Sequence, residues 1–158
     1  MIIIADSSAL VALSICRILP LLETIFDKVY VPKAVYNEVC ISGKPESKFL
    51  CEYLNNRVQS VSLKKLSLTN NPRLGIGELE AIALYLKTSA DLLLIDDAYA
   101  KKIASQNGLE VMGSIGVLLL AKQKGLISTI KPLITMLVNS EIHLGNNIIQ
   151  KALYLAKE

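Results

Sequence analysis

The sequence predicts an α/β protein of three layers (α/β/α), in which helices cover both faces of a central parallel sheet. Two observations predict this class. Residues 2–5 and 92–95 form short, fully apolar runs, which are typical of strands buried on both faces. Stretches with apolar residues at helical spacing separate the predicted strands through the first two-thirds of the chain, and such alternation favours a parallel sheet.

Caps and apolar spacing define the elements of the first half. Asp6 ends the first strand, and Ser7 or Ser8 is available to cap the helix that follows. Pro32 suits the first turn of a later helix, whose buried stripe includes Val35. For this half we predict strands at 2–5, 28–31 and 57–61, helices after residue 8 and at 21–26, 32–40 and 46–55, and a polar loop through residue 72.

Glycines delimit elements of the second half. A glycine-rich approach ends at Gly77, directly before a helix that begins at Glu78, and Gly108 stands where a later helix ends. No linker divides the sequence, so we expect one domain, with an α/β core at residues 1–125 and a helical C-terminal extension, residues 126–158, packed on it. For this half we predict strands at 92–95 and 110–112 and helices at 78–86, 97–107, 115–124, 129–138 and 147–157.

Composition bounds the class and location of the protein. Because 52% of the residues are hydrophobic and 20% are charged, the chain is expected to be globular. Its apolar runs stop short of the ~18 residues that span a bilayer, and no basic segment precedes Asp6. We therefore expect no membrane span, no signal peptide and a cytoplasmic protein. The net charge of +3 neither indicates nor excludes a nucleic-acid partner.

Cysteine and histidine supply little material for a site. Cys16, Cys40 and Cys51 are odd in number, form no C-x-x-C pair and lie in apolar stretches typical of buried thiols. We therefore expect neither a disulfide nor zinc. His143 is the single histidine and has no neighbouring acid, which leaves little for a catalytic triad or a two-histidine metal site. Any chemistry must rest on carboxylates.

Two aspartates follow the most apolar strands. Asp6 comes directly after residues 2–5, and Asp96 comes directly after residues 92–95. In an open parallel sheet the ligand crevice lies beyond the carboxyl ends of the strands, so both side chains would project from the same edge if these strands are neighbours. Taken singly, each aspartate also fits a helix cap, and only their joint placement favours a site.

Two glutamates are candidates on helices. Glu38 borders the buried stripe of its helix, where a purely solvated glutamate would lie farther round. Glu78 and Glu80 are about 200° apart on a helix, so at most one of them can face a shared pocket. We favour Glu78, which follows the glycine-rich approach, although a first-turn glutamate can equally serve to stabilise its helix.

A cluster of these acids requires protons or a cation. Two carboxylates about 4 Å apart repel by about 4 kcal/mol at an effective dielectric of 20. An all-oxygen site selects hard ions such as Mg²⁺ or Mn²⁺, and Mg²⁺ takes only one or two carboxylates directly. A hydrated divalent ion beside an acid suits phosphodiester hydrolysis. Phosphatases with an aspartate nucleophile fit less well, because Ser8 stands where they need a second acid.

The order of these motifs resembles the PIN domain. The resemblance rests on Asp6-Ser7-Ser8 after the first strand, P-x-x-V-x-x-E ending at Glu38, G-E-x-E-A-I-A beginning at Gly77, and the Asp96-Asp97 pair. A further motif, Gly-Ser-Ile-Gly-Val, includes Ser114. The sequence is most similar to a prokaryotic subgroup related to the VapC-like toxins of type II toxin–antitoxin systems.

The resemblance implies roles for individual residues. Asp6, Glu38 and Asp96 match the acids that hold Mg²⁺ or Mn²⁺, and Glu78 stands where many members have aspartate. The longer side chain of Glu78 leaves direct ligation and contact through water both open. Asp97 either assists the site or caps its helix. Supporting hydroxyls would come from Ser8 and Ser114, which can also be helix caps.

The resemblance also implies a function: a metal-dependent endoribonuclease that hydrolyses RNA, as the toxin of a toxin–antitoxin pair. The alternative is a catalytically silent PIN-fold module that binds RNA or a partner protein. Lys101 and Lys102 are candidate RNA contacts, with Lys122, Lys124, Lys64 and Lys65 as further candidates, although an ordinary solvated lysine is the commoner case for each. Apolar residues around Leu118 exceed the obvious needs of one core, so a homodimer or an antitoxin-binding groove is expected beside ordinary packing.

Overall fold

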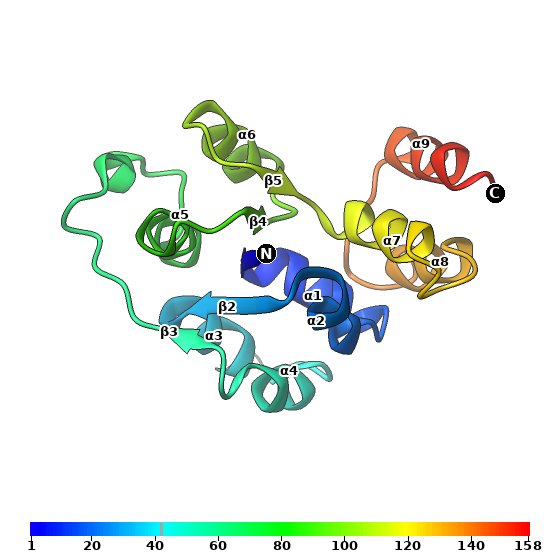
Figure 1. Cartoon of the computed structure of the whole chain (residues 1–158), viewed down its shortest axis with the longest axis horizontal. Helices are drawn as coiled ribbons and strands as arrows, with labels where there is room; N and C mark the ends of the chain where they lie inside the picture. Colours follow the sequence, from blue (N-terminus) through cyan, green and yellow to red (C-terminus); the bar gives the residue numbers. More distant parts are fainter. Residues whose placement is uncertain (42) are drawn as a thin grey trace.

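The centre of the protein is a parallel sheet. A computed structural model describes residues 1–41 and 43–158, and these form five strands in the order β3-β2-β1-β4-β5 (Figure 1). All strand pairs in this sheet are parallel. The strands are β1 (Ile2–Ala5), β2 (Lys28–Pro32), β3 (Val58–Gln59), β4 (Leu92–Leu94) and β5 (Val111–Met112).

Helices cover both faces of this sheet, which confirms the predicted three-layer α/β/α class (Figure 1). The helix predicted at 129–138 begins later, because Pro132 occupies its first turn. The helices are α1 (Ser7–Ile15), α2 (Leu22–Phe26), α3 (Lys33–Ile41), α4 (Ser47–Leu54), α5 (Ile76–Thr88), α6 (Ala98–Gln106), α7 (Ser114–Gln123), α8 (Lys131–Val138) and α9 (Asn146–Ala156), with short 3₁₀ turns η1 (Leu19–Leu21) and η2 (Ser67–Asn70).

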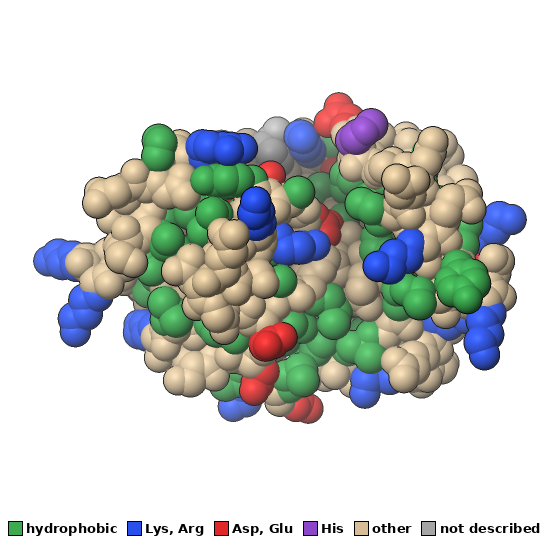
Figure 2. Space-filling view, turned by 90° about the horizontal axis from the view of Figure 1, so that it is seen from above, with side chains coloured by type: hydrophobic (Ala, Val, Ile, Leu, Met, Phe, Trp, Pro, Cys, Tyr) green, Lys and Arg blue, Asp and Glu red, His purple; other side chains and the backbone are tan. Residues whose placement is uncertain are grey.

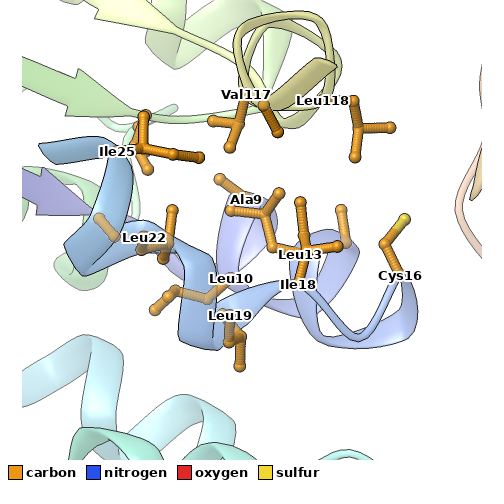
Figure 3. Packing of buried hydrophobic residues seen from close by; sticks show 14 of the residues in the cluster. Ala9, Leu10, Leu13, Cys16, Ile18, Leu19, Leu22, Ile25, Val117 and Leu118 are labelled. Carbon is orange, nitrogen blue, oxygen red and sulfur yellow. The ribbon is translucent and has the colours of Figure 1, made fainter. Parts of the chain in front are cut away.

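Side chains of β1 alternate between two cores, as the pleat of a strand requires. Ile3 and Ala5 belong to the larger core, which also contains residues of α1, α3, α4 and α7. Ile4 belongs to the smaller core, with residues of α5 and α6. In Figure 3, side chains of α1 such as Leu13 lie between those of the neighbouring segments and of α7. The strand that precedes Asp6 is therefore packed on both faces.

The C-terminal helices share the larger core. Ile134 of α8 and Ala152 of α9 are buried in the same cluster as α1 and α7. The Glu158 carboxylate joins the end of the chain to the start of α8, because it accepts hydrogen bonds from the backbone N–H groups of Ile130 (2.7 Å) and Lys131 (2.9 Å).

The expectation that no disulfide forms was wrong. Cys40 of α3 and Cys51 of α4 are joined by a disulfide, with their Cα atoms 5.4 Å apart. The two helices pack against each other, and this brings together two cysteines 11 residues apart in sequence. The odd count leaves Cys16 as the free cysteine, and burial raises the pKa of its thiol to about 11.

The apolar helices are short. Within residues 1–41 and 43–158, no single helix is both long enough and apolar enough to cross a membrane. In the described part of the chain, one pair of helical segments, Ser7–Ile15 and Leu19–Phe26, meets the length and composition criteria together, and the chain bends by 110° between them.

Candidate functional site

Two strand ends bring Asp6 and Asp96 to one edge of the sheet. β1 and β4 are neighbours, with Ala5 opposite Leu94 in their register. The backbone N–H of Asp6 donates a hydrogen bond to the carbonyl oxygen of Leu94 (2.8 Å). Both aspartates therefore lie at the carboxyl edge, where open parallel sheets form their crevice.

Ser8 links these two aspartates. Its hydroxyl donates a hydrogen bond to Oδ2 of Asp6 (2.7 Å), and the same hydroxyl accepts one from the backbone N–H of Asp96 (3.0 Å). The backbone N–H of Ser8 also donates to Oδ2 of Asp6 (3.3 Å), so Asp6 caps α1. Ser8 thus fixes the spacing between the two strand ends, and the capping interaction coexists with it.

One oxygen of Asp6 is left without a partner. The residue is only 2% exposed, and its Oδ1 is buried with no hydrogen-bond donor among the described residues. Burial raises the pKa of this carboxyl above its ordinary value, the hydrogen bonds from Ser8 lower it, and the charge of Glu38 raises it further. An unsatisfied buried carboxylate oxygen is costly, so this atom calls for a proton or a cation.

Asp96 is held by the start of α7. Its Oδ1 accepts a hydrogen bond from the backbone N–H of Ser114 (2.7 Å), and Ser114 itself is buried. The preceding Gly113 permits this approach, because a Cβ there would lie 2.6 Å from that oxygen and 2.7 Å from Nζ of Lys101. The structure therefore shows Ser114 acting on Asp96 through its backbone amide, with the Lys101 ammonium over the same glycine.

The side chain of Glu38 lies against the first turn of α5. It lies on the exposed side of α3, and its carboxylate covers Gly77 in the first turn of α5. A Cβ at position 77 would lie 2.5 Å from Oε1 of Glu38, closer than any real side chain permits. The glycine therefore provides the space in which this carboxylate lies.

Glu78 caps its own helix and lies near the other acids. Its Oε2 accepts a hydrogen bond from the backbone N–H of Gly75 (2.8 Å), which caps α5. Burial raises the pKa of Glu78 while this hydrogen bond lowers it, and the charges of Asp6, Asp97 and Glu38 raise it again. Glu78 therefore stabilises its own helix and lies within the electrostatic field of the other acids.

The remaining candidates lie on α6. Asp97 is exposed and caps this helix by accepting from the backbone N–H of Ala100 (2.8 Å). Lys101 is half-buried beside Gly113, whereas Lys102 is exposed. On the face seen in Figure 2, some acidic side chains lie recessed near the middle of the molecule, with lysine and arginine side chains nearby, and others project at its edges.

A family model described as a PIN domain matches residues 2–158. The chain belongs to the PIN-domain family. No curated protein matches the sequence significantly. PIN domains are generally nucleases that use divalent metal ions, which gives the acidic edge of this PIN domain a chemical context.

Glu80 is a residue of this PIN domain that the sequence pattern did not favour. Its Oε2 accepts a hydrogen bond from the backbone N–H of Ala34 (2.9 Å) in the first turn of α3. Glu38 is one turn farther along α3, on the same side as Ala34. Glu80 and Glu38 also line a common pocket of about 540 Å³. The packing of α3 on α5 creates this contact, and a helical period alone does not reveal it.

The acids of the PIN domain form a loose constellation. Among the described residues, no three His, Cys, Asp or Glu side chains are arranged closely enough to hold a metal ion. The buried, unpaired Oδ1 of Asp6 and an all-oxygen donor set nevertheless fit a hard divalent cation that keeps most of its water. The residues present are therefore compatible with an ion bound by few direct contacts.

Proposed function

We propose that this PIN domain is a Mg²⁺- or Mn²⁺-dependent endoribonuclease. The observation that carries the proposal is the Oδ1 atom of Asp6, a buried carboxylate oxygen with no partner in the described chain, at an edge that also holds Asp96. A carboxylate kept buried and unsatisfied lowers stability, and such strain concentrates at functional sites.

Four acids would hold the ion and its water. Asp6, Glu38 and Asp96 are the proposed metal-holding residues, and Glu78 would position metal-bound water. A bound divalent ion supplies an activated water and neutralises charge that develops on the phosphate. Ser8 supports the site by holding the Asp6 carboxylate and the Asp96 backbone in one arrangement.

The direct test is cleavage of total cellular RNA by the purified protein. We expect discrete products with Mn²⁺ or Mg²⁺, none with EDTA, and none from Asp96→Asn, which replaces the carboxylate by an amide of the same shape. Glu52→Gln is the matched control, because Glu52 is exposed on α4, a helix that carries none of the proposed site residues. Cleavage that persists in Asp96→Asn would contradict the proposal.

We further propose that the protein is a toxin that a small antitoxin protein neutralises, and that it forms a homodimer. The order of the acidic motifs supports the toxin role. We expect expression of the wild-type chain to arrest growth, Asp6→Asn to relieve the arrest, and a protein encoded beside it to relieve the arrest by direct binding. Mass measurement in solution tests the homodimer.

One observation favours a second function, that of a silent PIN-fold module that binds RNA without cutting it. Among the described residues, no three His, Cys, Asp or Glu side chains are grouped so that they could hold a metal ion together. A thermal shift with Mn²⁺ distinguishes the two functions: the nuclease requires a shift that Asp96→Asn abolishes, whereas a silent module requires none.

A further inference from the structure

A second pocket lies at the opposite end of α5 from the acidic edge. Its volume is about 650 Å³, and three exposed lysines contribute to its lining. No acidic residue is among its described lining residues, which sets it apart from the pocket beside Glu38. The residues of this lysine pocket are Val61, Ser62, Lys64, Lys65, Leu66, Ala83, Leu86 and Lys87.

The lysine pocket combines cations with exposed apolar surface. Leu86 of α5 is 55% exposed and supplies apolar surface beside the lysines. The ammonium of Lys87 is held at the rim, because it donates a hydrogen bond to the carbonyl oxygen of Ser60 (2.8 Å). Single-stranded nucleic acid needs this combination, in which cations contact the phosphates and an apolar surface contacts the bases.

One face of α5 connects the lysine pocket to the acidic edge. Ile76 and Glu80 line the pocket beside Glu38, and Ala83 and Lys87 line the lysine pocket. These four positions of α5 are spaced by four, three and four residues, so they form one stripe along the helix. At 1.5 Å per residue the stripe is about 16 Å long, a distance that a few nucleotides of an extended strand can span.

The segment between β3 and η2 forms one side of the lysine pocket. In Figure 1 the segment between β3 and η2 loops around the outer side of α5. Lysine or arginine side chains project at the same end of the molecule in Figure 2. The pocket therefore lies between α5 and this loop, at an end of the protein that carries positive charge.

We propose that the lysine pocket binds a nucleotide of the same single-stranded RNA whose scissile phosphate lies at the acidic edge. This inference rests on the proposed function. An acidic peptide could also contact three lysines, but the continuity of the α5 stripe with the pocket beside Glu38 favours a strand that passes both. Base stacking would be weak on aliphatic side chains, so the pocket would grip the strand with little sequence preference.

The test measures RNA affinity without cleavage. A short fluorescein-labelled oligoribonucleotide is titrated in EDTA with wild-type protein and with a variant that carries Lys64→Gln, Lys65→Gln and Lys87→Gln. We expect the affinity to fall by about tenfold or more. The dependence of affinity on salt should also weaken, by about 0.7 in log–log slope for each phosphate that the variant no longer neutralises. Leu86→Ser should lower the affinity and leave the salt slope unchanged.

The matched control removes the same charge elsewhere. Lys28, Lys48 and Lys151 are exposed and line neither the lysine pocket nor the pocket beside Glu38, and their replacement by glutamine should leave RNA affinity near the wild-type value. Equal reductions in both triple variants would overturn the proposal, because they would show a diffuse charge effect. So would an unchanged RNA affinity together with weaker binding of an acidic peptide.

This experiment separates the two proposals. Binding in EDTA does not require catalysis. If the wild-type protein cuts no RNA, and the pocket variant binds RNA more weakly than the wild type, the nuclease proposal is contradicted and the RNA site at the lysine pocket is supported. An active nuclease whose affinity is unchanged in that variant would contradict the lysine pocket alone.

Discussion

Two carboxylates of this protein face opposite environments. Asp6 is buried at the acidic edge with one oxygen lacking any partner in the described chain, and burial raises its pKa. Glu158 accepts hydrogen bonds on both oxygens, from Lys122 and Ile130 on Oε1 and from Lys131 on Oε2, and these lower its pKa to about 2. Both carboxylate oxygens of Glu158 therefore have hydrogen-bond partners, whereas only one carboxylate oxygen of Asp6 does.

The difference distinguishes a carboxylate that stabilises the fold from one that is available to bind a ligand. Glu158 joins the chain end to α7 and to the start of α8, so its charge favours the folded state. Asp6 receives hydrogen bonds from Ser8 on one oxygen only, and the other oxygen is available to a ligand. Glu158 therefore contributes to stability, whereas the acidic edge retains binding capacity at the expense of stability.

Asp6→Asn is the sharpest test of this comparison. The amide retains an acceptor for Ser8 and removes a buried charge, so we expect the free energy of unfolding at neutral pH to stay the same or to rise. Cleavage of RNA should fall by at least about a hundredfold, because the proposed metal-holding oxygen is removed. Thermal unfolding and RNA cleavage on one preparation measure both. A variant that unfolds more easily would show that Asp6 is a structural acid like Glu158.

Gly77→Ala tests the space that the acidic edge requires. An added Cβ would lie 2.5 Å from Oε1 of Glu38, so the carboxylate must move. We expect activity to fall by about ten- to a hundredfold, the cost of a misplacement on the order of 1 Å. Helix propensity opposes any loss of stability, since alanine is favoured over glycine by about 1 kcal/mol within a helix. Combining Gly77→Ala with Glu38→Asp, a shorter acid, should restore part of the activity; no recovery would show that another contact matters.

The sequence patterns that predicted the parallel sheet also predicted which aspartates lie at its carboxyl edge. Asp6 and Asp96 follow adjacent parallel strands, and the edge of such a sheet is a consequence of chain direction alone. Ser8 illustrates a limit of that reasoning. The sequence pointed to Ser7 or Ser8 as the cap of α1, but Asp6 is the cap. The contact of the Ser8 hydroxyl with the Asp96 backbone depends on the pairing of β1 with β4.

Contacts between helices could not be predicted in the same way. Helical spacing assigns Glu80 to the side away from the site, yet it meets α3, whose position depends on tertiary packing. The disulfide between Cys40 and Cys51 was missed for the same reason, since it depends on how α4 packs against α3. The strand predicted at 57–61 shortens to Val58–Gln59, because it pairs with β2 over only two residues.

Glu80→Ala tests whether this missed glutamate positions Glu38. Removal of the acceptor leaves the Ala34 N–H at the start of α3 without its partner, and we expect a decrease of about 1 kcal/mol in the free energy of unfolding. If Glu80 acts through Glu38, the concentration of Mn²⁺ needed for half-maximal thermal shift should also rise. Glu80→Gln, which keeps an acceptor, should recover most of both. Lower stability with an unchanged Mn²⁺ response would restrict Glu80 to a structural role.

The pH dependence of stability gives the finest distinction between the two carboxylates. A folded-state pKa of about 2 for Glu158 lies below its ordinary value, so its contribution is fully present above about pH 5 and is lost as the pH falls toward 2. Asp6 has the opposite sign: its raised pKa means that the folded state binds the proton first, which favours folding as the pH falls. Melting temperatures measured between pH 7 and pH 3 should therefore fall less steeply in Glu158→Gln than in the wild type and more steeply in Asp6→Asn. Parallel curves for the three proteins would mean that these carboxylates titrate alike in the folded and unfolded chains, and the contrast between them would be wrong.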